Sequence, residues 1–295
     1  MRVLCITLGI LATAPSVCRA QSQPSIPAGQ LVSEVVYNEL HDHQNHSYWR
    51  YWIERHSGTG TFLVSQVETA DGPISRLALS DGRPLTPEAH EQEEARLEKL
   101  LNSAEEQSRH AKQFDEDEAR IGRILALLPD AFLYEYDGEE NSCVRLGFRP
   151  NPDYPAQSIE SRVFHAMSGT LWVNTRFKRL ARLEGRVDEN VDFGFGILGR
   201  LYKGGWFRLD RMQVSPTDWK TERLEVHMNV RALLVKAFAR ETSEVRGGFA
   251  PVPAGLSLAK GLEMLNQNGG QIQGQSRAGT DGSQMAWAST ASRPQ

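Results

Sequence analysis

The first candidate for chemistry is a histidine cluster near the N-terminus. His41, His43 and His46 lie within six residues, together with Asp42. Neutral imidazole is a common ligand of zinc and copper, so these three side chains define one metal-site hypothesis. Their spacing does not match the His-Glu-x-x-His pattern of zinc proteases, which occurs nowhere in the sequence. We therefore expect a solvated turn here, and we predict no metal and no other cofactor.

A single cysteine remains once a predicted signal peptide is set aside. The chain has three cysteines, and Cys5 and Cys18 both lie in that N-terminal segment. Cys143 then has no intramolecular partner. It is either a reactive or partner-linking thiol, or a small apolar residue within a strand, and we predict the second role.

Other catalytic patterns are weak or missing. Gly194, Gly196 and Gly199 match the spacing of a dinucleotide-binding loop, but no strand-helix-strand pattern surrounds them. Glycines in this setting favour a bend or bulge in a curved sheet. The sequence contains neither the Gly-x-Ser-x-Gly elbow of hydrolases nor a phosphate-binding Walker loop. We predict that the protein is not an enzyme.

The N-terminus has the pattern of a secretory signal peptide over residues 1–20. A basic start at Arg2 precedes an apolar run over Val3–Ala14, and small residues end the segment at Ala20. We therefore predict export and a periplasmic location. A lipid-anchored form processed at Cys18 is the alternative, but Pro15–Val17 lacks the residues that such a site prefers.

Charge limits the classes of partner. The whole chain carries a formal charge of -4, which argues against nucleic-acid binding because a polyanion is bound by excess positive charge. A local group of basic residues is either the solvated face of a sheet, as we predict, or a surface that attracts anionic headgroups or an acidic partner. Membrane contact is then peripheral at most. The group comprises Arg176, Lys178, Arg179, Arg182, Arg186, Arg200, Lys203, Arg208 and Arg211.

An antiparallel meander must position most of the apolar side chains. From Gly169 to Glu241, short alternating segments are separated by turn residues. The predicted strands are Thr170–Asn174, Arg179–Val187, Val191–Leu198, Trp206–Ser215 and Arg223–Lys236. Alternate side chains of a strand point the same way, so one face of the meander is apolar. That face comprises Leu171, Val173, Ala181, Leu183, Val187, Val191, Phe193, Phe195, Ile197, Phe207, Leu209, Leu224, Val226, Met228 and Val230.

The N-terminal half adds strands to the same predicted sheet. A helix over Gly29–Leu40 packs on it, and strands follow at Tyr48–His56, Thr61–Thr69 and Ile74–Leu79. Two further strands are predicted at Ala131–Tyr136 and Cys143–Phe148.

Capping residues predict where the helices of the insertion begin and end. Thr86 caps a long acidic helix that runs to Arg120. Asp115 and Glu118 resemble a second capping box, and Pro129 is expected to stop the apolar helix that follows. Ser158 caps a short helix, which Gly169 is expected to end in a left-handed conformation.

The predicted organisation is one folded domain with flexible ends. A lead segment covers residues 21–28, the domain covers 29–250 with a helical insertion at 86–128, and 251–295 holds a short helix at Leu256–Leu265 and a Gln, Gly and Ser-rich tail. Such a tail buries too little apolar area to fold.

Several segments of the chain carry a family resemblance. They are Leu77–Glu88, Ser168–Asn174, Arg179–Gly185, Gly196–Gly199 with Lys203–Gly205, Trp219–Arg223 and Ala232–Lys236. Together, over about Leu31 to Phe249, the chain resembles the outer-membrane lipoprotein-sorting, or LolA-like, family of exported bacterial proteins. The resemblance implies an α+β fold, in which a curved antiparallel half-barrel has helices covering its concave face, with an acyl chain or another apolar ligand held there. The long acidic helix after Thr86 departs from the compact carriers.

The functional prediction follows from this fold. We expect a periplasmic, non-enzymatic binding protein for a hydrophobic ligand or lipoprotein acyl chains, because burial alone gives affinity for an apolar chain. An envelope interaction or sensing module that docks a protein partner through the acidic helix is the alternative. The predicted ligand-binding residues are Leu183, Phe193, Phe195, Phe207, Val226 and Met228.

Overall fold

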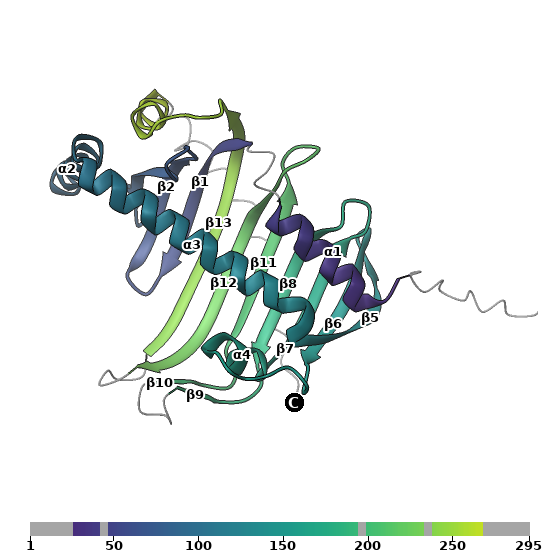
Figure 1. Ribbon diagram of the computed structural model, residues 1–295. Helices are drawn as coiled ribbons and strands as arrows, with labels where there is room; N and C mark the ends of the chain where they lie inside the picture. The colour runs from purple at the N-terminus through teal and green to yellow at the C-terminus, as the bar shows by residue number, and fades with distance from the viewer. Residues whose placement is uncertain (1–25, 42–46, 194–198, 233–237, 268–295) are drawn as a thin grey trace, which may run out of the picture.

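The computed structural model describes residues 26–41, 47–193, 199–232 and 238–267. It confirms the predicted α+β class: a curved antiparallel sheet, not closed into a barrel, has helices lying across one face (Figure 1). The helices are α1 (Ala28–Leu40), α2 (Pro87–Asn102), α3 (Ala104–Ala131) and α4 (Ile159–Phe164), and residues 258–267 are also helical. Within the described ranges, no helix combines the length and the apolar character needed to cross a membrane.

All described strands belong to one sheet, so the N-terminal strands continue the later meander as predicted. The order along the main path is β4-β3-β2-β1-β13-β12-β11-β8-β7-β6-β5, with β9 and β10 attached beside β12. The first strands are β1 (Tyr48–Ser57), β2 (Gly60–Val67), β3 (Ile74–Ser80), β4 (Arg83–Pro84), β5 (Phe132–Glu140) and β6 (Cys143–Pro150). The later strands are β7 (Met167–Asn174), β8 (Arg179–Val187), β9 (Val191–Phe193), β10 (Gly199–Leu201), β11 (Trp206–Gln213), β12 (Trp219–Ala232) and β13 (Phe238–Val252).

The strand β13 was not predicted, yet it joins the two halves of the sheet. It pairs with β1 on one side and with β12 on the other, both antiparallel. Without β13 the hairpin strands β1 and β2 have no described partner in the meander. Of the predicted strand over Val191–Leu198, Val191–Phe193 is a strand, β9, which pairs with β10; residues 194–198 lie outside the described part.

The predicted helix boundaries after Thr86 were wrong in two places. Thr86 caps α2 as expected, its hydroxyl accepting from the Ala89 backbone N–H, but α2 ends at Asn102. Ser103 then caps α3, its hydroxyl accepting from the Glu106 N–H. α3 runs without interruption through the expected boundary near Asp115, and Pro129 lies inside its last turn.

Two residues of the meander also differ from the prediction. Gly169 lies inside β7 and ends no helix; α4 closes through His165, whose N–H bonds to the Ser161 carbonyl. A bulge between Trp172 and Val173 shifts the register with β8, so Val173 pairs with Leu180. Leu180 is therefore buried in the core in the place where Ala181 was expected.

The main core lies between the sheet and two helices. Leu31, Val32 and Val35 of α1 are almost fully buried, as their helical spacing predicts. They pack in one cluster with Leu146 and Val173, which are fully buried on β6 and β7. Residues from the end of α3 complete this cluster, so α1 and α3 together cover the sheet around β5 to β8 (Figure 1).

The helix α2 is attached to the sheet and is not a free arm. Leu97 is only 1% exposed and packs in a second cluster with Val67 and Ile74. The Glu93 carboxylate accepts from the Leu77 backbone N–H at 2.8 Å and pairs with Arg96. The helical insertion thus contributes to the core at the β2–β3 end of the sheet.

Candidate functional site

The structure brings four of the predicted ligand-binding residues onto one side of three adjacent strands. Phe207 of β11 and Val226 of β12 are direct cross-strand partners. Leu183 of β8 lies opposite Leu209, two residues along β11 from Phe207. Met228 follows Val226 on the same side of β12. We call this the helix-facing side, because Leu183, Phe207 and Met228 pack on the core cluster that contains α1 and α3.

The other two predicted residues lie elsewhere. Phe193 ends β9, where it pairs with Gly199 of β10 and packs against the same core cluster. β10 in turn pairs with the end of β12, so Phe193 lies beyond the row of Phe207 and Val226. Phe195 falls outside the described residues.

The apolar residues of this side are buried to different degrees along the sheet. Under α1, Leu146, Leu171 and Val173 have at most 4% of their surface exposed. Further along the sheet, Leu183, Phe207, Leu209, Leu224, Val226 and Met228 are all only half-buried. The sheet therefore keeps accessible apolar surface on β8, β11 and β12.

The helix α3 crosses the sheet on this side and is held near its two ends. It has 28 residues, which gives a length of about 42 Å. Its first half contacts the β2–β3 turn, where a Cβ built on Gly72 would lie 3.0 Å from Cβ of Phe114. Its second half packs on α1, where a Cβ built on Gly122 would lie 3.7 Å from Leu40.

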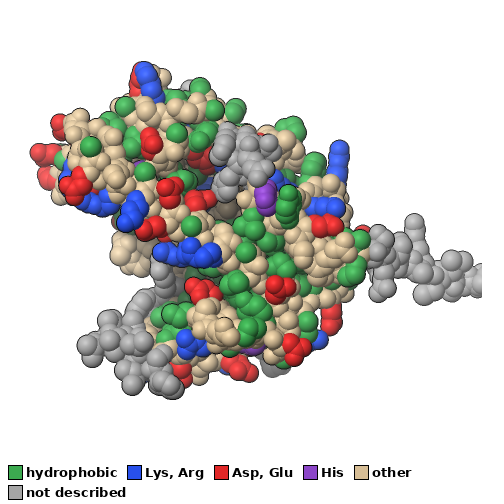
Figure 2. Space-filling view, in the orientation of Figure 1, with side chains coloured by type: hydrophobic (Ala, Val, Ile, Leu, Met, Phe, Trp, Pro, Cys, Tyr) green, Lys and Arg blue, Asp and Glu red, His purple; other side chains and the backbone are tan. Residues whose placement is uncertain are grey.

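Between these two supports, α3 adds little to the described core. The α3 residues in or against the core clusters are Ile124, Leu125, Leu127, Leu128 and Ala131, all in its last turns. Among the described residues, the half of α3 before Ile124 contributes no member to any of these clusters. Figure 2 shows this side of the molecule, with hydrophobic side chains gathered where α1 and the second half of α3 lie together. α3 therefore bridges the half-buried apolar strands.

A buried carboxylate continues the same row across the sheet. Leu209, Leu224 and Glu244 are successive cross-strand partners, so they point to the same side. Glu244 is 7% exposed; it accepts from Nε of Arg55 at 2.7 Å and from Nη2 of Arg246 at 2.8 Å. Burial by itself would raise the pKa of Glu244, but Arg246 and Arg55 outweigh it and lower that pKa. The apolar row thus ends at an ionised, fully paired carboxylate.

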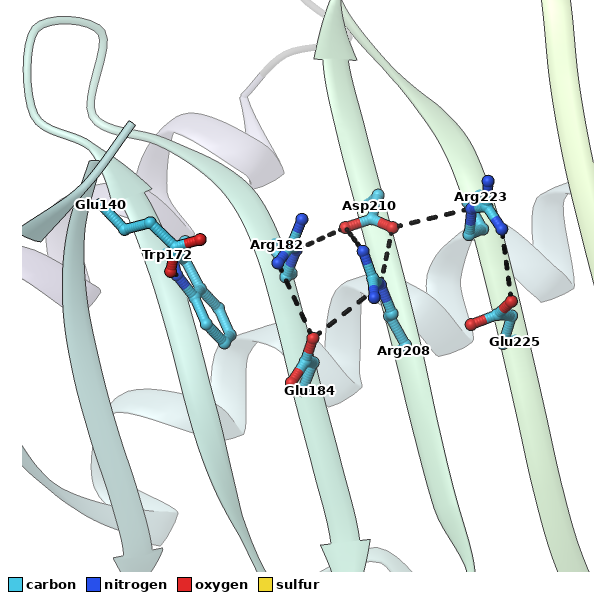
Figure 3. Close-up of polar contacts among 8 residues, drawn as sticks. All are labelled: Glu140, Trp172, Arg182, Glu184, Arg208, Asp210, Arg223 and Glu225. Atoms are coloured by element: carbon cyan, nitrogen blue, oxygen red, sulfur yellow. Dashed lines mark hydrogen bonds and ion pairs between the residues drawn. The ribbon is translucent and has the colours of Figure 1, made fainter. Parts of the chain in front are cut away.

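The opposite side of the same strands, which we call the outer face, carries an ion-pair network (Figure 3). Asp210 is 8% exposed and lies among three arginines. Its oxygens are 2.6 Å from Nε of Arg182 and 2.8 Å from Nε of Arg208. Arg223 reaches it at 4.0 Å and also pairs with Glu225 at 3.4 Å. In Figure 3 the helices run behind the strands that carry these side chains.

Most of the basic group noted in the sequence takes part in ion pairs of this kind. Several of its arginines have a carboxylate partner: Arg186 pairs with Asp188, Arg200 with Asp192, and Arg211 with Glu39. Lys178 likewise pairs with Glu34. The alternating acidic residues neutralise these cations, so the group does not form a uniformly positive surface.

The candidate residues for metal and thiol chemistry have ordinary surroundings where the structure describes them. The His41 ring stacks on Tyr37 at 4.0 Å, whereas His43 and His46 fall outside the described residues. The described ranges contain no group of three or more side chains that could hold a metal ion. Burial raises the pKa of the Cys143 thiol, so this side chain is protonated at neutral pH.

Sequence reasoning missed Glu244 and its two arginines, because the alternation that marks β13 is polar.

The chain has little detectable similarity to known proteins. No protein-family model matches the chain, and no curated protein matches it. A crystal structure of a DUF1329 family protein from Desulfovibrio piger ATCC 29098 is similar at 11% identity with a TM-score of 0.29, covering 80% of this chain and 97% of that chain. A similarity at this level carries no argument about function.

Proposed function

We propose that this protein is a non-enzymatic binding protein that holds an acyl chain or another apolar ligand between α3 and the sheet. One observation carries the proposal: apolar side chains of β8, β11 and β12 stay half-buried although α3 crosses the sheet above them. Exposed apolar surface of this kind is unfavourable in water and favourable for an apolar ligand. A ligand lying along Leu209, Phe207 and Val226 would gain about 0.8 kcal/mol for each methylene group it buries.

We place this function in the periplasm, in the handling of outer-membrane lipoproteins or lipids. The N-terminal signal pattern over residues 1–20 and the resemblance to the LolA-like family support that setting. The alternative, a docking module built on the acidic helix, has less support. Leu97 and Glu93 tie α2 to the sheet, as a structural element would be tied.

The test compares tryptophan substitutions at two neighbouring positions of β12, one on each side of the sheet. Val226→Trp adds a bulky side chain on the helix-facing side, whereas His227→Trp places the same bulk on the outer face. The probe is a fluorescent long-chain fatty acid titrated into the delipidated full chain, with unlabelled fatty acid as competitor. We expect saturable binding by the wild type, a loss of about tenfold or more for Val226→Trp, and no change for His227→Trp.

Two results would refute this function. The first is a wild-type protein that carries no lipid by mass spectrometry of an organic extract and also fails to bind the fatty acid probe. The second is equal binding by both tryptophan variants, with melting temperatures showing that both are folded.

A further inference from the structure

The outer face contains a groove that the apolar site does not use. Its cavity has a volume of about 830 Å³ and lies over β5, β6, β7, β8, β11 and β12. Glu135, Gly147, Thr170, Glu184, Arg208 and Glu225 form one continuous cross-strand row along it. The groove therefore runs across the strands, with small residues in the middle of its floor and charged side chains towards both ends.

The size of the groove fits an extended ligand. Neighbouring strands are about 4.8 Å apart, so six strands give a groove about 24 Å long. Gly147, Ser168 and Thr170 keep its central floor low, because none of them has a long side chain. A chain of several small rings, lying perpendicular to the strands, matches this length.

The charges of the groove do not select an anion. Its lining includes three arginines and four carboxylates, and all seven are paired. Arg149 lies 3.6 Å from Glu135, Arg186 2.8 Å from Asp188, and Arg208 2.8 Å from Asp210. A phosphate or sulfate would have to displace a carboxylate from its arginine. Paired arginines and carboxylates still offer hydrogen-bond donors and acceptors side by side, which is what neutral hydroxyl groups require.

An exposed indole stands at the end of the groove near β12. Trp206 is 42% exposed, although tryptophan is usually buried. Its ring lies parallel to the His227 ring, at 3° and with centroids 5.8 Å apart, and this stacking fixes its orientation. The cross-strand partner on the other side is Arg186, which also lines the groove. A flat aromatic surface held beside polar side chains suits a ligand that has an apolar face and a hydroxylated edge.

We propose that this groove binds a neutral, unbranched oligosaccharide. The Trp206 indole packs on the C–H face of one sugar ring. Glu184, Arg208 and Glu225 exchange hydrogen bonds with the hydroxyl groups of the sugars that cross β8, β11 and β12. The charge balance of the lining favours a neutral saccharide over a phosphorylated or sulfated one.

Isothermal titration calorimetry of the full chain tests this directly, with the neutral hexasaccharides cellohexaose, maltohexaose and hexa-N-acetylchitohexaose as probes. We expect saturable binding of at least one of them, and a loss of about tenfold or more in Trp206→Ala. Trp206→Phe should keep most of the affinity because it keeps an aromatic face. The matched control is Trp172→Ala, because Trp172 lies on the same face under Arg182 and outside the lining of the groove. It should leave the affinity unchanged.

Three results would overturn the proposal. The first is a wild-type protein that binds none of the three hexasaccharides. The second is binding that Trp206→Ala leaves intact while thermal melting shows a folded variant. The third is tighter binding of a sulfated hexasaccharide, titrated in parallel and lost on adding salt, than of the three neutral ones, since that behaviour belongs to an anion site. Fatty-acid binding is measured separately on the same samples, so failure here is distinguishable from failure of the apolar site.

Discussion

Phe207 of β11 lies directly opposite Gly185 of β8, and its ring covers the position where that residue would carry a side chain. A Cβ built on Gly185 would lie 2.6 Å from Cζ of Phe207, far inside van der Waals contact. Gly185 in turn pairs with Gly169, which is covered in the same way by the ring of Phe148. The two aromatic rings thus occupy the space above two paired glycines in the middle of the sheet.

This relationship predicts that Gly185→Ala is destabilising even though alanine suits a strand better than glycine. The added methyl group must push the Phe207 ring aside, and overpacking of this kind typically costs about 1–3 kcal/mol. Gly147→Ala on β6 is the control, because a Cβ there meets nothing within 4 Å. Denaturant unfolding of both variants measures the difference. Equal stabilities for the two would contradict the packing described.

A second prediction concerns the contact between α3 and the β2–β3 turn. Gly72 and Gly82 both have positive φ, at 94° and 70°, so alanine is strained at either position. Only at Gly72 does a new Cβ approach α3, at 3.0 Å from Phe114. We expect Gly72→Ala to lower the free energy of unfolding by about 1 kcal/mol more than Gly82→Ala.

The same contact has a second readout. Placed in a Phe114→Gly background, Gly72→Ala should lose most of that extra cost, because the Phe114 Cβ and ring that the new methyl group would meet are both gone. If the destabilisation caused by Gly72→Ala were the same in both backgrounds, the contact between Gly72 and Phe114 would not hold α3 at this turn.

A third prediction is a pH dependence from Glu244. Its folded-state pKa is lowered by Arg246 and Arg55, so it contributes stability above the ordinary carboxyl pKa. That contribution is lost as the pH falls through the lower folded-state pKa. Glu244→Gln should cost about 2 kcal/mol near neutral pH, and the gap to the wild type should shrink in acid.

The control for this prediction is an exposed ion pair. Glu105→Gln removes a partner of Arg109 that is 84% exposed, and such pairs contribute little. Chemical denaturation across the acid range follows all three proteins. A constant difference between wild type and Glu244→Gln at every pH would show that the carboxylate charge does not matter.

A fourth prediction concerns Cys143. Burial raises the pKa of its thiol, so little thiolate exists at neutral pH. Thiol reagents should label the native protein more slowly than free cysteine, and denaturation should bring the rate to the free-cysteine value. Fast labelling of the native chain would instead support the reactive-thiol reading.

Much of the fold could be predicted because its signals are local. The alternation of apolar residues placed β1, β2 and β8 within one or two residues of their observed bounds. Hydroxyl caps at Thr86 and Ser158 marked two helix starts correctly, since the cap bond forms within the next turn.

Other features depend on contacts that the sequence does not show. β13 contains Glu241, Glu244 and Arg246 together with paired glycines, so it lacks the apolar alternation of a central strand. Its polar side chains are satisfied only by partners such as Arg55, which lies 189 residues away. The break at Ser103 did carry a local signal, a serine three residues before Glu106, but the apolar stripe continuing past it favoured one long helix.

Which residues share one side of the candidate site could be predicted from the sequence, but how they pair across strands could not. Alternation placed Leu183, Phe207, Val226 and Met228 on one side of their strands, as found. The pairing of Phe207 with Val226, and the end of that row at Glu244, required the register between strands. The outer face followed the same rule: the arginines were visible in the sequence, but their carboxylate partners become evident only when β8, β11 and β12 are aligned.

The position of β13 has a consequence for the order in which the chain can assemble. β1 is made early, yet one of its two sheet neighbours, β13, is the last strand in the described part of the chain. Until residues 238–252 emerge, one edge of the first hairpin stays open and able to pair with another molecule. A chaperone that shields the open edge of this hairpin would therefore raise the yield of folded protein. A truncation that removes β13 should produce aggregates and no smaller soluble domain.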